Sequence, residues 1–308
     1  MSLLAEMLSN PKTCIRCMPE SAAADLRADL RRVPIIQCSN VAHYLFEHTN
    51  LNDWYKEGFE NLAPPFERFW MEFKVPKAVI LSQERVEWKL SGDYLGALIE
   101  GSKRPPWTLD LSTFVDIDSR PFDCSYMFTF HVELDDDAHT ILLPGSTRPE
   151  MFIPHGTSLR HMIDGFRYTP EETEKLKVAA MIHWAALFPM FLAISFMHCK
   201  NVTLKQQASD AALAKRNLQR GKPSLKYHVI EIEPLKQILR TEGRIETEGL
   251  PKALHICRGH FAKYAEDGPG LFGKGIHGRF WIPQHVRGSE KRGVVVSDYN
   301  VKAPKERA

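Results

Sequence analysis

The spacing of apolar positions is helical near the start of the chain and strand-like through its middle. Apolar residues recur every three or four positions over residues 21–32 and 38–46, which predicts two short helices. Residues 107–118, WTLDLSTFVDID, alternate apolar and polar positions, as a strand with one buried face does. We therefore expect a strand-rich part from about residue 74 to residue 154.

A hairpin is predicted within this part, in the run SYMFTFHVELDDDAHTILLPG at residues 125–145. The positions expected to share one face of its first strand are Phe128, Phe130 and Val132. The acids expected between the two strands are Asp135, Asp136 and Asp137. Aspartate favours turns because its side chain hydrogen-bonds the local backbone. A solvated turn is the simpler interpretation, and a divalent-cation site that includes Glu133 is the alternative, because hard cations prefer oxygen ligands.

A run without charges, VAAMIHWAALFPMFLAISFMHC, extends over residues 178–199. Its length would suffice to span a bilayer. However, Pro189 lies in its middle, and His183 and His198 are awkward in lipid. We expect a long central helix that is buried on most sides and kinked at Pro189, with a membrane span as the alternative.

The last third of the chain predicts a separate small domain. Residues 205–226 are polar and basic and contain the breaker Gly-Lys-Pro, which indicates a linker or exposed arm. Strand patterns follow at residues 227–234, 253–264, 278–288 and 293–302, with a short helix at 235–240. The predicted fold class is α+β, with an N-terminal domain over 1–204, the basic arm over 205–226, and a C-terminal domain with a mainly antiparallel sheet over 227–308.

Composition supports a folded protein of two domains: 308 residues, 44% hydrophobic and 25% charged. The six cysteines are scattered and no secretory pattern precedes them, so we expect reduced thiols in a cytoplasm. Cys14 and Cys17 have the spacing of metal ligands, but no second pair of ligands stands nearby at similar spacing. We accordingly expect no metal and no cofactor, and no membrane association.

Charge is distributed unevenly along the chain. Residues 205–308 contain 20 Lys and Arg against 11 Asp and Glu, a balance of +9, whereas the rest of the chain has 20 against 27, a balance of −7. A basic segment concentrates opposite charge, which favours a polyanion or an acidic protein as partner. A solvated basic face without a partner is the alternative.

Arginine, histidine and aromatic residues are concentrated in CRGHFAKYAEDGPGLFGKGIHGRFWIPQHVRG, residues 257–288. Arginine binds phosphate with a bidentate fork, and aromatic rings, Phe261 among them, can stack on bases or on a peptide. The predicted RNA- or partner-binding residues are Arg258, Tyr264, Arg279, Trp281 and Arg287, with Lys215, Arg216 and Arg220 in the arm.

Two other interpretations of the same stretch stay open. Pairing of its strands could bring His260 and His285 together as acid and base for metal-independent RNA cleavage, with arginines stabilising the phosphorane. In an ordinary sheet, by contrast, Trp281 and Phe261 would fill the core and the charges would face water.

The motifs of this stretch resemble those of a known family. In order they are Arg258-Gly259-His260-Phe261, then Tyr264, then Arg279-Phe280-Trp281-Ile282-Pro283. This order is similar to the C-terminal signature of the type V-A anti-CRISPR family of phages and mobile elements, which runs Arg-Gly-His-Trp, Tyr, Arg-x-Trp-x-Pro. The run FPMFL at residues 188–192 is similar to the family's Leu-Pro-Tyr-Leu-Leu helix. The chain departs from the signature at Phe261, where Trp is usual, and in its longer loop at residues 265–278.

The resemblance implies a phage-encoded anti-defence protein that acts on host translation or mRNA. The family's known action is to lower production of a CRISPR effector nuclease by removing its mRNA during translation. Expected partners are therefore RNA, the ribosome or a nascent chain, or a host CRISPR effector. An RNA endonuclease and a protein–protein interaction module without RNA contact remain the alternatives.

Overall fold

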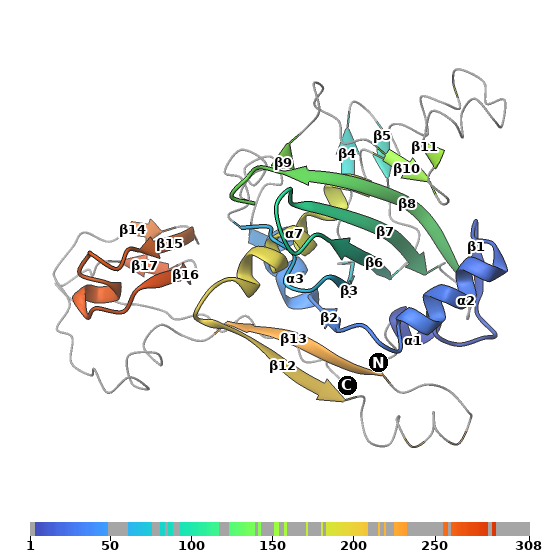
Figure 1. The fold of residues 1–308 in the computed structure, drawn as a ribbon, viewed down its shortest axis with the longest axis horizontal. Coiled ribbons are helices and arrows are strands. Elements are labelled where there is room, and N and C mark those ends of the chain that lie inside the picture. Colours follow the sequence, from blue (N-terminus) through green and yellow to red (C-terminus); the bar gives the residue numbers. More distant parts are fainter. Residues whose placement is uncertain are drawn as a thin grey trace. The chain divides into compact units, whose positions relative to one another are not determined.

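The chain forms two compact units in a computed structural model (Figure 1). Unit 1 comprises Met1–Ile194 and Gln206–Val229, and unit 2 comprises Ser195–Lys205 and Ile230–Ala308. The structure describes residues 4–48, 61–75, 81–83, 86–88, 93–116, 123–138, 141–142, 151–153, 157–158, 171, 180, 183–208, 215, 219, 225–232, 255–257, 260–282 and 285–287.

Unit 1 is built on a large mixed sheet. Eleven of the described strands form it, in the order β11-β10-β8-β7-β6-β3-β2-β13-β12, with β1 and β9 also paired to β8. The long antiparallel strands are β3 (Arg68–Lys74), β6 (Tyr94–Gly101), β7 (Thr108–Asp116) and β8 (Asp123–Leu134). The shorter strands are β1 (Cys14–Arg16), β2 (Ile35–Gln37), β9 (Ile141–Leu142), β10 (Met151–Ile153), β11 (Thr157–Ser158), β12 (Val202–Ala208) and β13 (Lys226–Ile232). A separate hairpin consists of β4 (Leu81–Gln83) and β5 (Val86–Trp88).

The strand and hairpin predictions for the middle of the chain are confirmed. Strand β7 lies within the predicted 107–118, and β8 pairs with β9 across a turn that contains the three acids. Ala138 at the end of this turn adopts a left-handed conformation with φ 56°. Phe128, Phe130 and Val132 are all buried on β8, as their alternation predicts.

One face of the sheet is apolar because β7 and β8 alternate strictly over much of their length. On this face Phe130 packs against His183, with ring centroids 6.1 Å apart, and against Trp184, at 5.3 Å. Burial lowers the pKa of His183 to about 3, so its imidazole is neutral and belongs to the core. Each large apolar side chain buried here stabilises the fold by about 1.5–3 kcal/mol.

The other face is divided between an apolar end and a polar end, because a β-bulge changes which side chains of β8 reach it. The register of β7 and β8 shifts between the pairs Ser112–Thr129 and Phe114–Tyr126. Beyond the shift, Phe114 and Tyr126 join a core with Trp70, which α1 (Leu4–Leu8) and α2 (Glu20–Asp29) cover. Figure 1 shows these two helices at one end of the long strands. Before the shift, the same face carries polar residues.

The helices agree only in part with the sequence. The predicted short helices correspond to α2 and to α3 (Ser39–His48). The prediction of one long helix over 178–199 is not confirmed: α7 covers Phe188–Met197, and Leu187 forms a turn before it. Pro189 is the second residue of α7 and does not kink a helix at its middle, because the first helical turn needs no donor from that position. Among the described residues, no helix is both long enough and apolar enough to cross a membrane.

Unit 2 contains two antiparallel strand pairs that share one register. Strand β15 (His260–Tyr264) pairs with β16 (Gly278–Ile282), and β14 (His255–Cys257) pairs with β17 (His285–Arg287). A 3-10 turn, η1 (Leu271–Gly273), lies in the loop between β15 and β16. One face of the β15–β16 hairpin packs on Leu271 and Ile276. The predicted helix at 235–240 and strand at 293–302 lie outside the described residues.

The predicted basic arm overlaps two strands. Strand β12 extends into its first residues, and β13 begins at its last residue, Lys226. The two compact units meet in sequence within α7, β12 and β13. Most of the arm between these strands lies outside the described residues.

Candidate nucleic-acid interface

Lys200 and Asn201, which follow α7, form hydrogen bonds with the backbone of β16. The backbone N–H of Lys200 donates to the carbonyl of Arg279 at 2.8 Å. The side chain of Asn201 donates from Nδ2 to the carbonyl of Trp281 and accepts at Oδ1 from its N–H, both at 2.9 Å. Asn201 is fully buried. Its side-chain amide makes the hydrogen bonds to the backbone of Trp281 that a neighbouring strand would otherwise make. Lys200 is thereby held beside the hairpin.

Two cations face each other across the hairpin. Lys263 lies directly opposite Arg279 in the β15–β16 ladder, and residues directly opposite share a face with Cβ atoms about 4.5–5.5 Å apart. Like charges in this position are destabilising. Lys263 is exposed and Arg279 is half-buried. This rung therefore places two cationic side chains on one face of the hairpin.

A third cation, Lys200, approaches the adjacent rung, where Tyr264 pairs with Gly278 and whose side chains point to the face opposite Lys263 and Arg279. The Lys200 side chain runs against Gly278, so that its Cε lies 2.6 Å from the place that a Cβ on this residue would occupy. Gly278 also has φ +125°, a conformation that side chains rarely permit. We call Lys200, Lys263 and Arg279 the cationic corner.

Among the described residues of the hairpin and its loop, the acids lie in the loop and not on the strands. Glu266 and Asp267 are exposed in the turn after β15. The loop is closed on itself by His277, whose Nδ1–H donates to the carbonyl of Ala265 at 2.5 Å. Apart from His260, the charged residues of β15 and β16 are Lys263 and Arg279.

Trp281 corrects the sequence-based list of binding residues. Only 1% of its surface is exposed, because its ring packs between Phe196 at 4.7 Å and Phe261 at 4.8 Å. It therefore belongs to the core of unit 2 and is not available to stack on a base. Tyr264 is half-buried and lies edge-on to Phe280 at 5.9 Å.

The two candidate catalytic histidines occupy different rungs. His260 is exposed and lies opposite Ile282, whereas His285 lies opposite Cys257, three positions away along each strand. The backbone register therefore does not pair the two histidines with each other.

The remaining predicted residues are only partly described. Arg287 pairs through its backbone with His255 in β17, and Lys215 is exposed at a helical position. The predicted residues that lie outside the described part of the chain are Arg258, Arg216 and Arg220. Sequence reasoning did not select Lys200 and Lys263 because their proximity to Arg279 depends on the strand register and on the contact made by Asn201. The alternation of side chains within a single strand indicates neither the register nor the contact.

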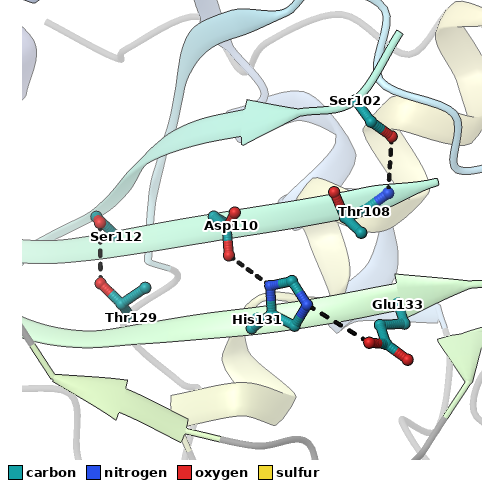
Figure 2. A network of polar contacts seen from close by, with 7 residues as sticks. All are labelled: Ser102, Thr108, Asp110, Ser112, Thr129, His131 and Glu133. Atoms are coloured by element: carbon teal, nitrogen blue, oxygen red, sulfur yellow. Dashed lines mark hydrogen bonds and ion pairs between the residues drawn. The ribbon is translucent and has the colours of Figure 1, made fainter. Parts of the chain in front are cut away.

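A second polar cluster lies on the polar end of the unit 1 sheet (Figure 2). His131 on β8 contacts Asp110 on β7, with 2.7 Å between Nδ1 and Oδ1, and its Nε2 lies 3.8 Å from Glu133. On the next rung the hydroxyls of Ser112 and Thr129 are 2.9 Å apart. An imidazole between two carboxylates can exchange protons, but the adjacent hydroxyls are hydrogen-bonded to each other.

The same row of charged residues continues across the sheet. Glu100 lies opposite Asp110, and Arg68 lies opposite Glu100, 2.7 Å away. Arg68 also contacts Asp29 at 2.8 Å. Arg68 thus pairs with two of these acids within the fold, and His131 contacts the other two. Among the described residues, no group of three or more His, Cys, Asp or Glu side chains is placed to hold a metal ion.

A buried carboxylate, Glu72, was not anticipated from the sequence. It lies on β3 with no exposed surface and accepts hydrogen bonds from Leu4 N at 3.2 Å, Ala5 N at 2.8 Å and Trp70 Nε1 at 2.8 Å. Burial raises its pKa to about 7, although the three donors favour the ionised form. These hydrogen bonds hold the start of α1 against the sheet. The role of Glu72 is therefore structural.

Comparison with known proteins does not place the chain in a family. No protein-family model, no curated protein and no solved structure matches it. The family resemblance therefore depends on the quoted sequence motifs alone.

Proposed function

We propose that the protein binds RNA through the cationic corner of unit 2. The observation that carries this proposal is the rung in which Lys263 lies opposite Arg279. Two cationic side chains on one face form a positively charged surface that favours the phosphate groups of a nucleic acid. Lys200 adds a third positive charge on a segment that hydrogen bonds hold against β16.

RNA is favoured over an acidic protein because of the extent of the positive charge. The balance of +9 over residues 205–308 suits a repeating polyanion, which contacts many cations along its backbone. The half-buried Phe261 on the same face offers an aromatic surface beside the cations, a combination used by proteins that bind nucleic acid.

The biological role that we propose follows from the resemblance of the C-terminal motifs. A phage or mobile-element protein with this interface would act against host defence at the level of translation or mRNA. The described residues that support RNA binding lie within the part of the chain that carries the resemblance.

The test is RNA binding by the purified full chain at two salt concentrations, compared with Lys263→Ala and Arg279→Ala. Release of counterions should make binding fall steeply with salt, and each substitution should reduce the slope of log K against log salt by about 0.7–0.9. Lys103→Ala is the matched control, because Lys103 is an exposed lysine of unit 1 that pairs with Glu67. Absence of binding at low salt, or equal loss with the control, would refute the proposal.

The same assay decides between the alternatives. RNA that is cleaved in the presence of chelator by the parent, but not by folded His260→Ala and His285→Ala, would establish the metal-independent nuclease in place of a binder. Failure to bind RNA together with stable co-purification of a host protein would instead establish a protein–protein interaction module.

A further inference from the structure

We propose that Cys14 and Cys17 are a dithiol that exchanges with small-molecule disulfides, and that β1 leaves β8 when the two sulfurs join. This inference concerns unit 1 and is independent of RNA binding. It assigns a role to the Cys-x-x-Cys spacing at residues 14–17.

Both thiols can be reached from solvent. Cys14 and Cys17 are free and exposed, whereas the other cysteines that the structure describes as free are buried: Cys38, Cys124 and Cys199. Arg16 stands between the two in sequence. Its pKa is raised first by its hydrogen bond to Asp123 and, to a smaller degree, by the charges of the two thiols. Both sulfurs therefore lie near one guanidinium.

Strand β1 keeps the two cysteines too far apart to bond. Cys14 begins the strand, Arg16 ends it, and Cys17 follows directly. At about 3.2–3.4 Å per residue, the Cα atoms of Cys14 and Cys17 lie about 10 Å apart. A disulfide requires about 4.4–6.8 Å between Cα atoms, so the chain must leave its extended form before the bond can close.

The pairing that holds β1 extended is short. Three parallel rungs join Cys14–Arg16 to Asp123–Ser125. Ile15 packs in the core below them, and Arg16 donates from Nε to Asp123 at 2.9 Å. Cys17 has φ 60°, a left-handed conformation that residues other than glycine seldom adopt. Such strain is common in segments that switch, and release of β1 removes the constraint that imposes it.

The exchange balances with the small disulfide as its only other reactant. One cysteine thiolate attacks a sulfur of this disulfide, forms a mixed disulfide and releases one small thiolate. The second cysteine thiolate then attacks the protein sulfur of the mixed disulfide, closes the bond between the cysteines and releases the other small thiolate. The two cysteine protons end on the two small thiols. The protein loses two electrons and the small disulfide gains them, and an excess of small thiol reverses both steps.

The experiment titrates the full chain with mixtures of reduced and oxidised glutathione. Mass spectrometry of the peptide that contains both cysteines should show the loss of two hydrogen atoms, whereas Cys14→Ser should keep one glutathione on Cys17. Amide hydrogen exchange at residues 14–16 should be about 5- to 150-fold faster in the oxidised protein, the range usual for linked equilibria, and unchanged in β6.

Reciprocal coupling distinguishes a switch from two merely exposed thiols. Ile15→Val removes packing that only the paired form of β1 has, and should raise the equilibrium constant for oxidation by about 2- to 13-fold. Ile99→Val is the matched control, because Ile99 is equally buried in the same sheet but lies on β6, between β7 and β3. This control should leave the equilibrium constant unchanged.

Three results would overturn the inference. The first is a separate glutathione on each cysteine of the parent without an internal disulfide. The second is an internal disulfide that leaves hydrogen exchange at residues 14–16 as it is in the reduced protein. The third is an equal response of the oxidation equilibrium to Ile15→Val and Ile99→Val.

Discussion

One rung of the large sheet in unit 1 pairs a cation with an acid across its strands, whereas one rung of the β15–β16 hairpin pairs two cations. On the large sheet Arg68 faces Glu100, and His131 faces Asp110. On the hairpin Lys263 faces Arg279. The first arrangement brings opposite charges together, which stabilises the folded chain, whereas the second places two positive charges on one face.

The difference shows that polar residues which contact one another within the sheet can be told apart from a group of like charges. The imidazole and carboxylates of Figure 2 resemble an active site, yet the imidazole contacts both carboxylates within the sheet. The cationic corner has no catalytic appearance, but it places two cations on one face of the hairpin.

The largest effect is expected from Asn201, a polar residue of unit 2 that serves the fold. Asn201→Ala removes both hydrogen bonds to Trp281, and each buried group deprived of a partner costs about 1–3 kcal/mol. Chemical denaturation should show this loss in unit 2. Lys200→Ala, one residue away and exposed, keeps its backbone hydrogen bond and should change the free energy of unfolding little. Equal destabilisation by the two variants would contradict the assignment.

An intermediate effect is expected from Glu72, the buried carboxylate of unit 1. Its pKa is about 7 in the folded chain against 4.5 ordinarily, so the folded state binds more protons than the unfolded state between these values. The contribution of Glu72 to stability is thus complete below about pH 4.5 and is lost as the pH rises through about 7. The loss is about 3 kcal/mol.

Denaturation at several pH values tests this. Glu72→Gln should remove the decline, whereas Glu100→Gln, at an exposed carboxylate of the same sheet, should leave it in place. RNA binding should not change with Glu72→Gln. A variant with the pH dependence of the parent would show that the carboxylate is not held in the buried state described.

The smallest effect, and the most direct test of the comparison, comes from charge reversal on each unit. Lys263→Glu places an acid opposite Arg279 and should raise the free energy of unfolding by about 0.2–1 kcal/mol while weakening RNA binding. Arg68→Glu places an acid opposite Glu100 and should lower the free energy of unfolding by a similar amount. If both variants were destabilised, the two regions would not differ as described.

Sequence patterns predicted the antiparallel part of the fold well. Strict alternation in β7 and β8 identifies both strands and their buried face, since the period of two is a local property. The parallel pairs of β2 with β3 and of β13 with β2 were not predicted. Three residues are too few to show a period, and the partners lie far apart in the chain.

The candidate site was predicted only in part, for a related reason. The sequence located the two strands of the hairpin, but it left open whether Trp281 lies on a binding surface or in the core. The burial of Trp281 depends on Phe196, which lies 85 positions earlier in the chain. Nor does any local pattern indicate that Lys200 lies beside Gly278. Contacts between distant segments decide which members of an aromatic and basic stretch are accessible.

The contact between Asn201 and Trp281 also sets an order of events during synthesis. The two residues are 80 positions apart, which at about 5–20 residues per second corresponds to about 4–16 seconds of translation. Throughout this interval Phe196 and Asn201 have already been made, but the strand that buries them has not. The hairpin that carries the cationic corner therefore becomes complete only after β16, which ends at Ile282, has been translated.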